Sequence, residues 1–285
     1  MLNVLFDGIA YGMLLFVLAL GLSVTLGLMN FVNLAHGAFG MAGGYVCVLL
    51  LNRYGASFWA CLAAAFLGAA LLGVLLERTL YRRLYGGSHF DQVLFSLGLV
   101  FVSMSVANYI MGAQQQLIRL PDFLTGRTDL GPLQVGTYRL FLILLCGCLA
   151  LALQLTLVRT RFGTRLRAAV DDPRVARGLG IPVDRIFAVT FAVGSGLAGL
   201  GGALGVEILG LDPTFPVKFM IYVLIVVTVG GTSSIMGPLA ASLVLGCLDV
   251  AGKYYVPAIG AFVIYAAMVA ILILRPRGLF ARSGG

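Results

Sequence analysis

The longest stretch of the chain without a charged side chain constrains its fold most. Residues 8–52 contain no Asp, Glu, Lys or Arg over 45 consecutive positions. A membrane-spanning helix needs about 20 mostly apolar residues, so this stretch can hold two such helices and the turn between them. Only 11% of all residues are charged, compared with about 25% in soluble domains. The sequence therefore predicts a chain that folds in a lipid bilayer.

Six further charge-free stretches lie at 54–76, 92–118, 140–158, 186–206, 219–248 and 254–274. The stretch 219–248 is interrupted by glycine and polar residues at 230–238, so it holds either two short spans or one span and a re-entrant segment. We predict an all-α, polytopic membrane protein with eight or nine transmembrane helices, folded as one transmembrane domain over residues 1–285. A signal peptide begins with a positively charged segment, whereas this chain has Asp7 before its first apolar stretch. The first stretch is therefore interpreted as a retained span.

Basic residues are concentrated in three segments of the chain. Residues 77–91, residues 159–185 and the C-terminus hold 13 of the 19 Lys and Arg residues. With nine spans all three segments lie on one side, and an excess of Lys and Arg in short loops marks that side as cytoplasmic. The N-terminus then lies outside, and the longest outer loop is 113–138. This topology accounts for the net charge of +8 without nucleic-acid binding.

The inner loop 159–185 carries the signals of a short, capped helix. Asp172 suits the N-cap and Pro173 the first helical position. Gly180 suits the position just past the helix end, and Pro182 prevents continuation. These signals predict a helix over about 173–179. It is interpreted either as a docking helix for a cytoplasmic partner or as part of a basic loop anchored to anionic lipid.

The residues around this helix support a structured loop. Upstream, Phe162, Leu166 and Ala169 share one helical face while the arginines lie elsewhere, as in an interfacial helix. Within the predicted helix, Val175, Ala176 and Leu179 are apolar. A short rigid element with apolar side chains is suited to transmitting force to or from a partner.

Two polar, glycine-rich segments interrupt the apolar stretches. Their residues are Asn30, Asn33 and His36 in the first, and Gly230, Gly231, Thr232 and Ser233 in the second. Polar groups at membrane depth usually mark a cavity or an interhelical hydrogen bond. Broken helices in the two halves of a chain are typical of transporter substrate sites. We predict that both segments line a substrate path; the alternative for the first is the end of a span.

The segment Gly194–Gly199 spells G-x-G-x-x-G. The dinucleotide-binding use of this pattern needs a preceding strand and an acidic residue about 20 positions later, but here the context is an apolar span. Taken as small residues at four-residue spacing, Gly194, Ala198 and Gly202 form a face for close helix packing. We discern no nucleophile–base set, paired carboxylates, metal-ligand spacing or P-loop. The sequence therefore predicts no enzyme activity, no metal and no cofactor in this chain.

Three separated stretches together resemble the permease subunits of branched-chain amino-acid ABC transporters. They are NFVNLAHGAFGMAGGY at 30–45, TRFGTRLRAAVDDPRVARGLGIPVDRIFAVTFAVGSGLAGLGGALG at 160–205 and GGTSSIMGPLAA at 230–241. The resemblance implies that the inner-loop helix is the coupling helix that sits in a groove of an ATPase subunit. On this view the coupling residues are Asp171, Asp172, Pro173, Ala176, Gly178, Gly180 and Ile181.

The resemblance also implies a set of partners and a location. These are a homologous second permease forming a heterodimer, two cytoplasmic ATPase subunits that use the ATP, and a soluble substrate-binding protein. The location is the bacterial inner membrane, as a multi-pass protein. The substrates would be leucine, isoleucine and valine, although related permeases carry urea or short amides.

Two other classes of protein compete with this interpretation. A self-sufficient secondary transporter or channel needs a coupling-ion site, usually built from buried acids, and Glu207 and Asp249 both lie near predicted span ends. A membrane-embedded enzyme needs polar catalytic residues clustered near one interface, and the sequence offers no such set.

Overall fold

The computed structural model of the chain describes residues 1–29, 33–84, 87–131, 133–231 and 235–275. The long helices are α1 (Leu2–Met29), α3 (Phe58–Thr79), α4 (His89–Met111), α5 (Thr137–Arg159), α8 (Val183–Leu209) and α10 (Met236–Tyr255). The shorter apolar helices are α2 (His36–Asn52), α9 (Phe215–Gly230) and α11 (Gly260–Leu274). The loops hold α6 (Arg161–Asp171), α7 (Pro173–Gly178), η1 (Tyr81–Leu84), η2 (Asp122–Leu124) and the strands β1 (Arg127–Leu130) and β2 (Leu133–Gly136).

The prediction of an all-α, polytopic membrane protein is confirmed. Six helices are long and apolar enough to cross a membrane, and α2, α9 and α11 are shorter apolar helices. The stretch 8–52 contains α1 and α2, and the stretch 219–248 is divided between α9 and α10. Within the described ranges, the antiparallel hairpin β1–β2 in the loop 113–138 departs from the helical pattern.

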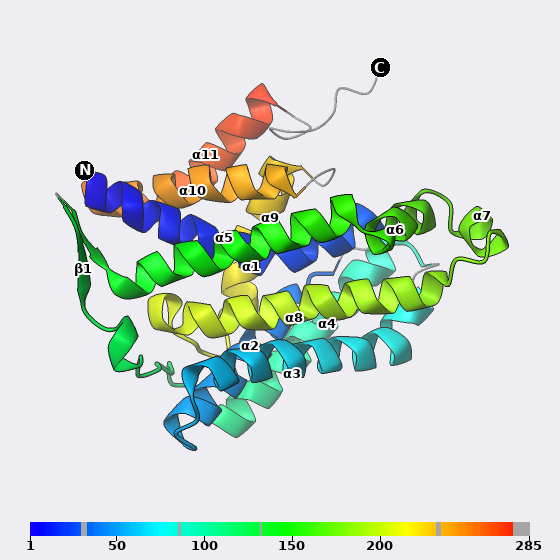
Figure 1. The fold of residues 1–285 in the computed structure, drawn as a ribbon, viewed down its shortest axis with the longest axis horizontal. Helices are drawn as coiled ribbons and strands as arrows, with labels where there is room; N and C mark the ends of the chain where they lie inside the picture. The colour runs from blue at the N-terminus through cyan, green and yellow to red at the C-terminus, as the bar shows by residue number, and fades with distance from the viewer. Residues whose placement is uncertain (30–32, 85–86, 132, 232–234, 276–285) are drawn as a thin grey trace.

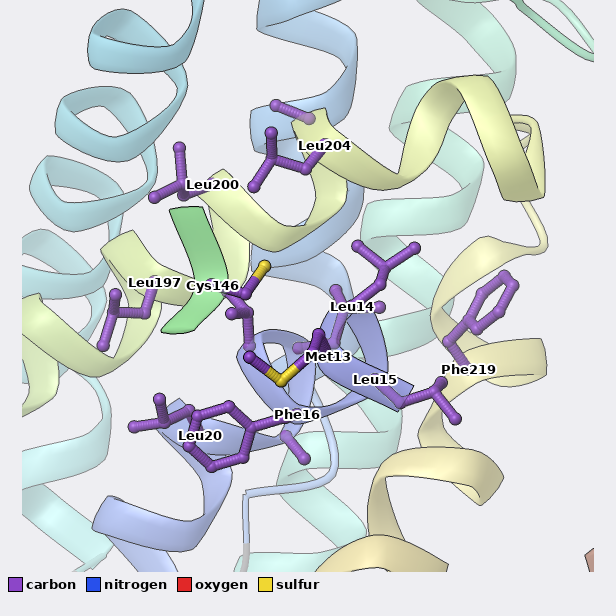
Figure 2. Close-up of a cluster of buried hydrophobic side chains, with 14 of the residues drawn as sticks. Met13, Leu14, Leu15, Phe16, Leu20, Cys146, Leu197, Leu200, Leu204 and Phe219 are labelled. Atoms are coloured by element: carbon purple, nitrogen blue, oxygen red, sulfur yellow. The ribbon is translucent and has the colours of Figure 1, made fainter. Parts of the chain in front are cut away.

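Helix α1 forms the centre of the bundle. Every residue from Ala10 to Thr25 is buried, which fits a helix that is apolar on all sides. Its neighbours are α5, α8, α9 and α10. Figure 2 shows side chains of α1, including Phe16 and Leu20, gathered with Cys146 of α5, Leu200 of α8 and Phe219 of α9. The sequence places no charged side chain between Ala10 and Thr25, so this core consists mainly of packed apolar side chains.

Helix α8 lies against α1, α2 and α3, and glycines allow its close contact with α2. A Cβ atom on Gly202 would overlap the carbonyl oxygen of Gly40, and a Cβ on Gly43 would overlap the backbone of Gly199. Small residues at such positions let two helix backbones approach directly. The α2–α8 contact therefore requires glycine on both helices.

The predicted packing face of α8 follows the same side of the helix. A Cβ on Gly194 would lie 3.3 Å from the carbonyl oxygen of Gly21 in α1, and the Ala198 carbonyl oxygen lies 3.5 Å from where a Gly40 Cβ would be. The G-x-G-x-x-G pattern lies wholly within α8, so its glycines occupy helical backbone and not the strand–helix turn of a dinucleotide site.

The bundle has two distinct ends, which Figure 1 shows at the left and right of the view. We call the left one the hairpin end, since it carries β1 and the N-terminus, and the right one the α7 end, since it carries α6 and α7. At the periphery, α3, α4 and α5 leave large apolar side chains exposed, among them Leu71, Tyr109 and Leu144. Continuous apolar surface of this kind is suited to lipid or to another membrane subunit.

Candidate functional site

Helix α6 leads into the loop at the α7 end as an amphipathic helix. Its side chains of Leu166 and Ala169 are buried and Phe162 is half-buried, whereas Arg165 and Arg167 are exposed. The Thr160 hydroxyl caps the helix by accepting a hydrogen bond from the Gly163 amide. The apolar face that the sequence predicts is therefore the face that packs on the bundle.

Helix α7 begins at Pro173 and ends at Gly178, one residue before the predicted end. Asp172 Oδ1 accepts hydrogen bonds from the amides of Arg174 at 2.8 Å and Val175 at 3.0 Å. These bonds stabilise the carboxylate and hold the pKa of Asp172 below its usual value. Gly180 has φ of +79°, a left-handed conformation that favours glycine and turns the chain toward α8.

The side chains of α7 divide into a buried anchor and an exposed tip. Ala176 packs with Ala169 and Val183, and the partly buried Ile181 joins this cluster. Val175 and Leu179 are 58% and 75% exposed. The apolar residues that the sequence groups together therefore have opposite positions: Ala176 fixes the helix to its own chain, while Val175 and Leu179 face away. Asp171 and Gly178 are also exposed.

An acidic residue at the start of α8 joins α7 to the loop after α3. Asp184 forms ion pairs with Arg82 of η1 at 2.5 Å and with Arg177 of α7 at 3.1 Å. All three side chains are about half-exposed, so each pair contributes little to stability. Their effect is geometric, since one carboxylate holds two loop elements at the base of α8.

The described side chains of the first polar segment, Asn33 and His36, are buried. The Asn33 Oδ1 accepts hydrogen bonds from the Ala35 amide at 3.1 Å and from the Tyr81 hydroxyl at 2.9 Å. Asn33 Nδ2 is buried and has no hydrogen-bond partner in the described ranges. His36 Nε2 lies 3.0 Å from the carbonyl oxygen of Leu18 in α1. Asn30 lies outside the described residues.

The second polar segment follows the end of α9. Gly230 is buried, and a Cβ there would overlap the backbone of Pro238 at the start of α10. Gly231 has φ of +80°, and its amide donates a hydrogen bond to the Val227 carbonyl at 2.8 Å. Thr232 and Ser233 lie outside the described residues.

The described residues of both polar segments lie near the level of the middle of α1. The first starts α2 beside Leu18, through the His36 contact. The second precedes α10, which runs antiparallel to α1 with Cys247 against Gly8 and Ser242 against Gly12. Continuing that register at 1.5 Å per residue places the start of α10 beside the middle of α1. Figure 1 shows α9 running across the long axis of the bundle.

Three polar side chains are buried although the sequence suggests contact with water; among them is Asp249, which the sequence analysis places near a span end. Glu77 of α3, Gln92 of α4 and Asp249 of α10 are each almost fully buried. All three lie within a few residues of a span end, where sequence alone suggests contact with water. No group of three or more His, Cys, Asp or Glu able to hold a metal ion occurs in the part of the chain that the structure describes.

Taken together, the apolar bundle and the partly exposed loop helix at one of its ends define a polytopic α-helical membrane protein. The profile of the family described as the permease component of the branched-chain amino acid transport system matches residues 4–272. The chain belongs to this family.

Individual relatives align along nearly the whole chain. LivH of Escherichia coli K12 and BraD of Pseudomonas aeruginosa, both high-affinity branched-chain amino acid transport system permease proteins, are each 25% identical over 99% of this chain and 96% of their own length. LivM of Escherichia coli K12, a permease protein of the same kind of system, is 26% identical over 94% of this chain and 68% of its own length. No solved structure shows a significant match.

Proposed function

We propose that this chain is the membrane-spanning permease subunit of an ATP-driven importer for branched-chain amino acids in the bacterial inner membrane. The family match over residues 4–272 supports the class of protein, and the names of the relatives support the substrate. The observation that carries the proposal is the form of α7: a capped helix fixed by Ala176, with Val175 and Leu179 exposed.

Helix α7 is proposed as the element that receives force from an ATPase subunit. An exposed apolar pair on a rigid helix can enter a groove of a partner, because burying both side chains supplies the free energy of docking. The Asp184 ion pairs then transmit displacement of α7 to α8 and to η1. The α7 end is accordingly the cytoplasmic end, and the ATP is used by partner subunits.

The two polar segments are proposed to line the substrate path. A branched-chain amino acid has two charged ends and an apolar side chain, so its path needs hydrogen-bonding groups beside an uncharged wall. Asn33 and His36 supply side-chain groups, and the break at Gly230 and Gly231 supplies backbone groups, at the same level of α1. The path is completed by a homologous second permease, and the hairpin end receives substrate from a soluble binding protein.

Substrate competition tests this proposal. The chain is co-expressed with a second permease, two ATPases and a binding protein of the same transport system, and uptake of radiolabelled leucine is measured in cells that lack other leucine transporters. Unlabelled isoleucine and valine should compete, and urea and acetamide should not. Uptake of urea or acetamide in place of leucine would contradict the proposed substrate.

A further inference from the structure

A half-open cavity of about 450 Å³, lined by both charged and apolar residues, lies at the hairpin end of the bundle. Residues at the start of α1, the start of α5, the end of α8, the first turns of α9 and the end of α10 line it. Figure 1 shows the ends of α1, α5, α8 and α10 gathered there. The volume falls in the range typical of small-molecule sites, and the cavity is separate from α7 and from both predicted path segments.

Asp249 of α10 supplies the cavity with an incompletely paired negative charge. Its side chain is 1% exposed, and Oδ2 accepts a hydrogen bond from Lys253 Nζ at 2.5 Å. Oδ1 is buried and has no hydrogen-bond partner anywhere in the described residues. Because a buried carboxylate oxygen without a donor is costly, this atom is suited to a ligand that carries N–H groups. The other acid of the cavity, Asp7, is already paired with Arg139.

The cations of the cavity lie nearer to solvent than Asp249. Lys218 and Lys253 are each about half-exposed. Lys218 forms an ion pair with Asp212 at 2.6 Å, and the Lys253 ammonium lies 5.6 Å from the centre of the Tyr11 ring. The cavity therefore holds a buried carboxylate oxygen next to ammonium groups whose side chains extend toward solvent. A ligand with a positive and a negative end matches this arrangement.

The remaining wall is apolar and aromatic. Ile208 of α8 and Phe219 and Tyr222 of α9 line it, and the two α9 rings are 5.9 Å apart. Such a wall can bury an aliphatic side chain, at roughly 25 cal/mol for each Å² removed from water.

We propose that this cavity is a binding site for a free α-amino acid with an aliphatic side chain, occupied before the substrate enters the path between the polar segments. Asp249 Oδ1 accepts hydrogen bonds from the substrate ammonium, and Lys218 and Lys253 bind its carboxylate. Lys253 is already paired with the other oxygen of the Asp249 carboxylate. Its ammonium can therefore pair with Oδ1 when the substrate leaves, so that the substrate is not held too tightly to be released. This site assignment rests on the proposed import function.

Cysteine protection tests the site in the assembled transporter. The five native cysteines are replaced, Ile208→Cys is introduced, and its rate of labelling by a membrane-impermeant maleimide is measured on the complex in nanodiscs. Saturating leucine should slow labelling at least fivefold. At the same concentration 4-methylpentanoate, which lacks the ammonium, and isopentylamine, which lacks the carboxylate, should not. A reporter at Asp129→Cys on β1, outside the cavity, should be unaffected by leucine.

Substitution of the buried acid provides the second arm. Asp249→Asn should abolish protection of Ile208→Cys, whereas Asp129→Asn, the same change at an exposed position of the same end, should retain it. Equal protection by 4-methylpentanoate, or unchanged protection in Asp249→Asn, overturns the site. If the Asp249→Asn variant does not assemble, the proposal is tested by comparing the protection given by leucine with that given by its two analogues in the protein that retains Asp249.

Leucine uptake by the same preparations separates this inference from the proposed function. Leucine uptake without protection of Ile208→Cys would overturn the proposed cavity site but not the proposed import function. Protection by leucine without ATP-driven uptake supports the site and overturns the import function.

Discussion

The hydroxyl of Tyr81 donates a 2.9 Å hydrogen bond to the side-chain oxygen of Asn33, and both side chains are buried. Tyr81 opens η1, whose next residue, Arg82, pairs with Asp184. Asp184 in turn pairs with Arg177 of α7. A continuous series of contacts thus joins α7 to the first polar segment, and each contact involves groups that can be altered singly.

Tyr81→Phe should weaken this connection without emptying the core. The substitution removes the hydroxyl and keeps the ring contacts with Phe95 and Phe191, so the stability cost should be about 1 kcal/mol. We expect leucine uptake to fall severalfold while the complex assembles normally. Tyr54→Phe, at an exposed tyrosine, is the matched control. Equal uptake by both variants would show that the Asn33–Tyr81 bond has no part in transport.

The exposed tip of α7 should determine binding of the ATPase subunits. Val175→Ser together with Leu179→Ser removes the two apolar side chains that face away from the chain. The retained caps should keep the helix folded. Co-purification of the ATPases with the permease should fall at least tenfold. The pair Val102→Ser and Val106→Ser on the exposed face of α4 should leave co-purification unchanged; a comparable loss there would indicate a general assembly defect.

Close packing of α8 on α2 predicts a strong difference between two glycines. Gly202→Ala places a Cβ against the Gly40 backbone, whereas a Cβ on Gly98 of α4 meets nothing within 4 Å. Overpacking costs about 1–3 kcal/mol, and alanine in an open helical position stabilises by up to about 1 kcal/mol. Thermal unfolding in detergent should therefore show a lower midpoint for Gly202→Ala and an equal or higher one for Gly98→Ala.

The two ends of the bundle should lie on opposite sides of the membrane. Single cysteines at Asp129 in β1 and Gly87 before α4, each in a cysteine-free background, are both exposed. In intact cells an impermeant maleimide should label the first after the outer membrane is opened, and the second only after the inner membrane is also permeabilised. Labelling of both positions under the same condition would rule out the nine-span topology.

Local signals made α7 predictable from the sequence. Asp172, Pro173 and Gly180 act on atoms within a few residues of themselves, so cap chemistry alone locates the helix to within one residue. The apolar helices were also predictable, because the length of a charge-free stretch can be compared with the roughly 20 residues that a membrane-spanning helix needs. The hairpin β1–β2 was not predicted, since its strands are only four residues each and lie in a loop with little period-two patterning.

Contacts between distant segments were beyond sequence reasoning. Tyr81 follows a basic span end and suggests a loop residue, yet it is buried by Asn33, 48 positions away. Asp249 lies near the end of its span and suggests contact with water, yet the packing of α10 beside α1 and α9 buries it. Burial of such residues depends on how helices cross, which hydropathy along one chain does not specify.

ATP-driven uptake by the reconstituted complex tests the central claim most directly. Proteoliposomes with enclosed ATP and external binding protein should accumulate leucine, and those with ADP or with a sodium or proton gradient alone should not. In the triple variant Asp172→Ala, Pro173→Ala and Gly180→Ala, which removes the start and stop signals of α7, uptake should fall at least tenfold although the permease pair still assembles. Accumulation driven by an ion gradient without ATP, or unchanged uptake in the triple variant, would contradict the account.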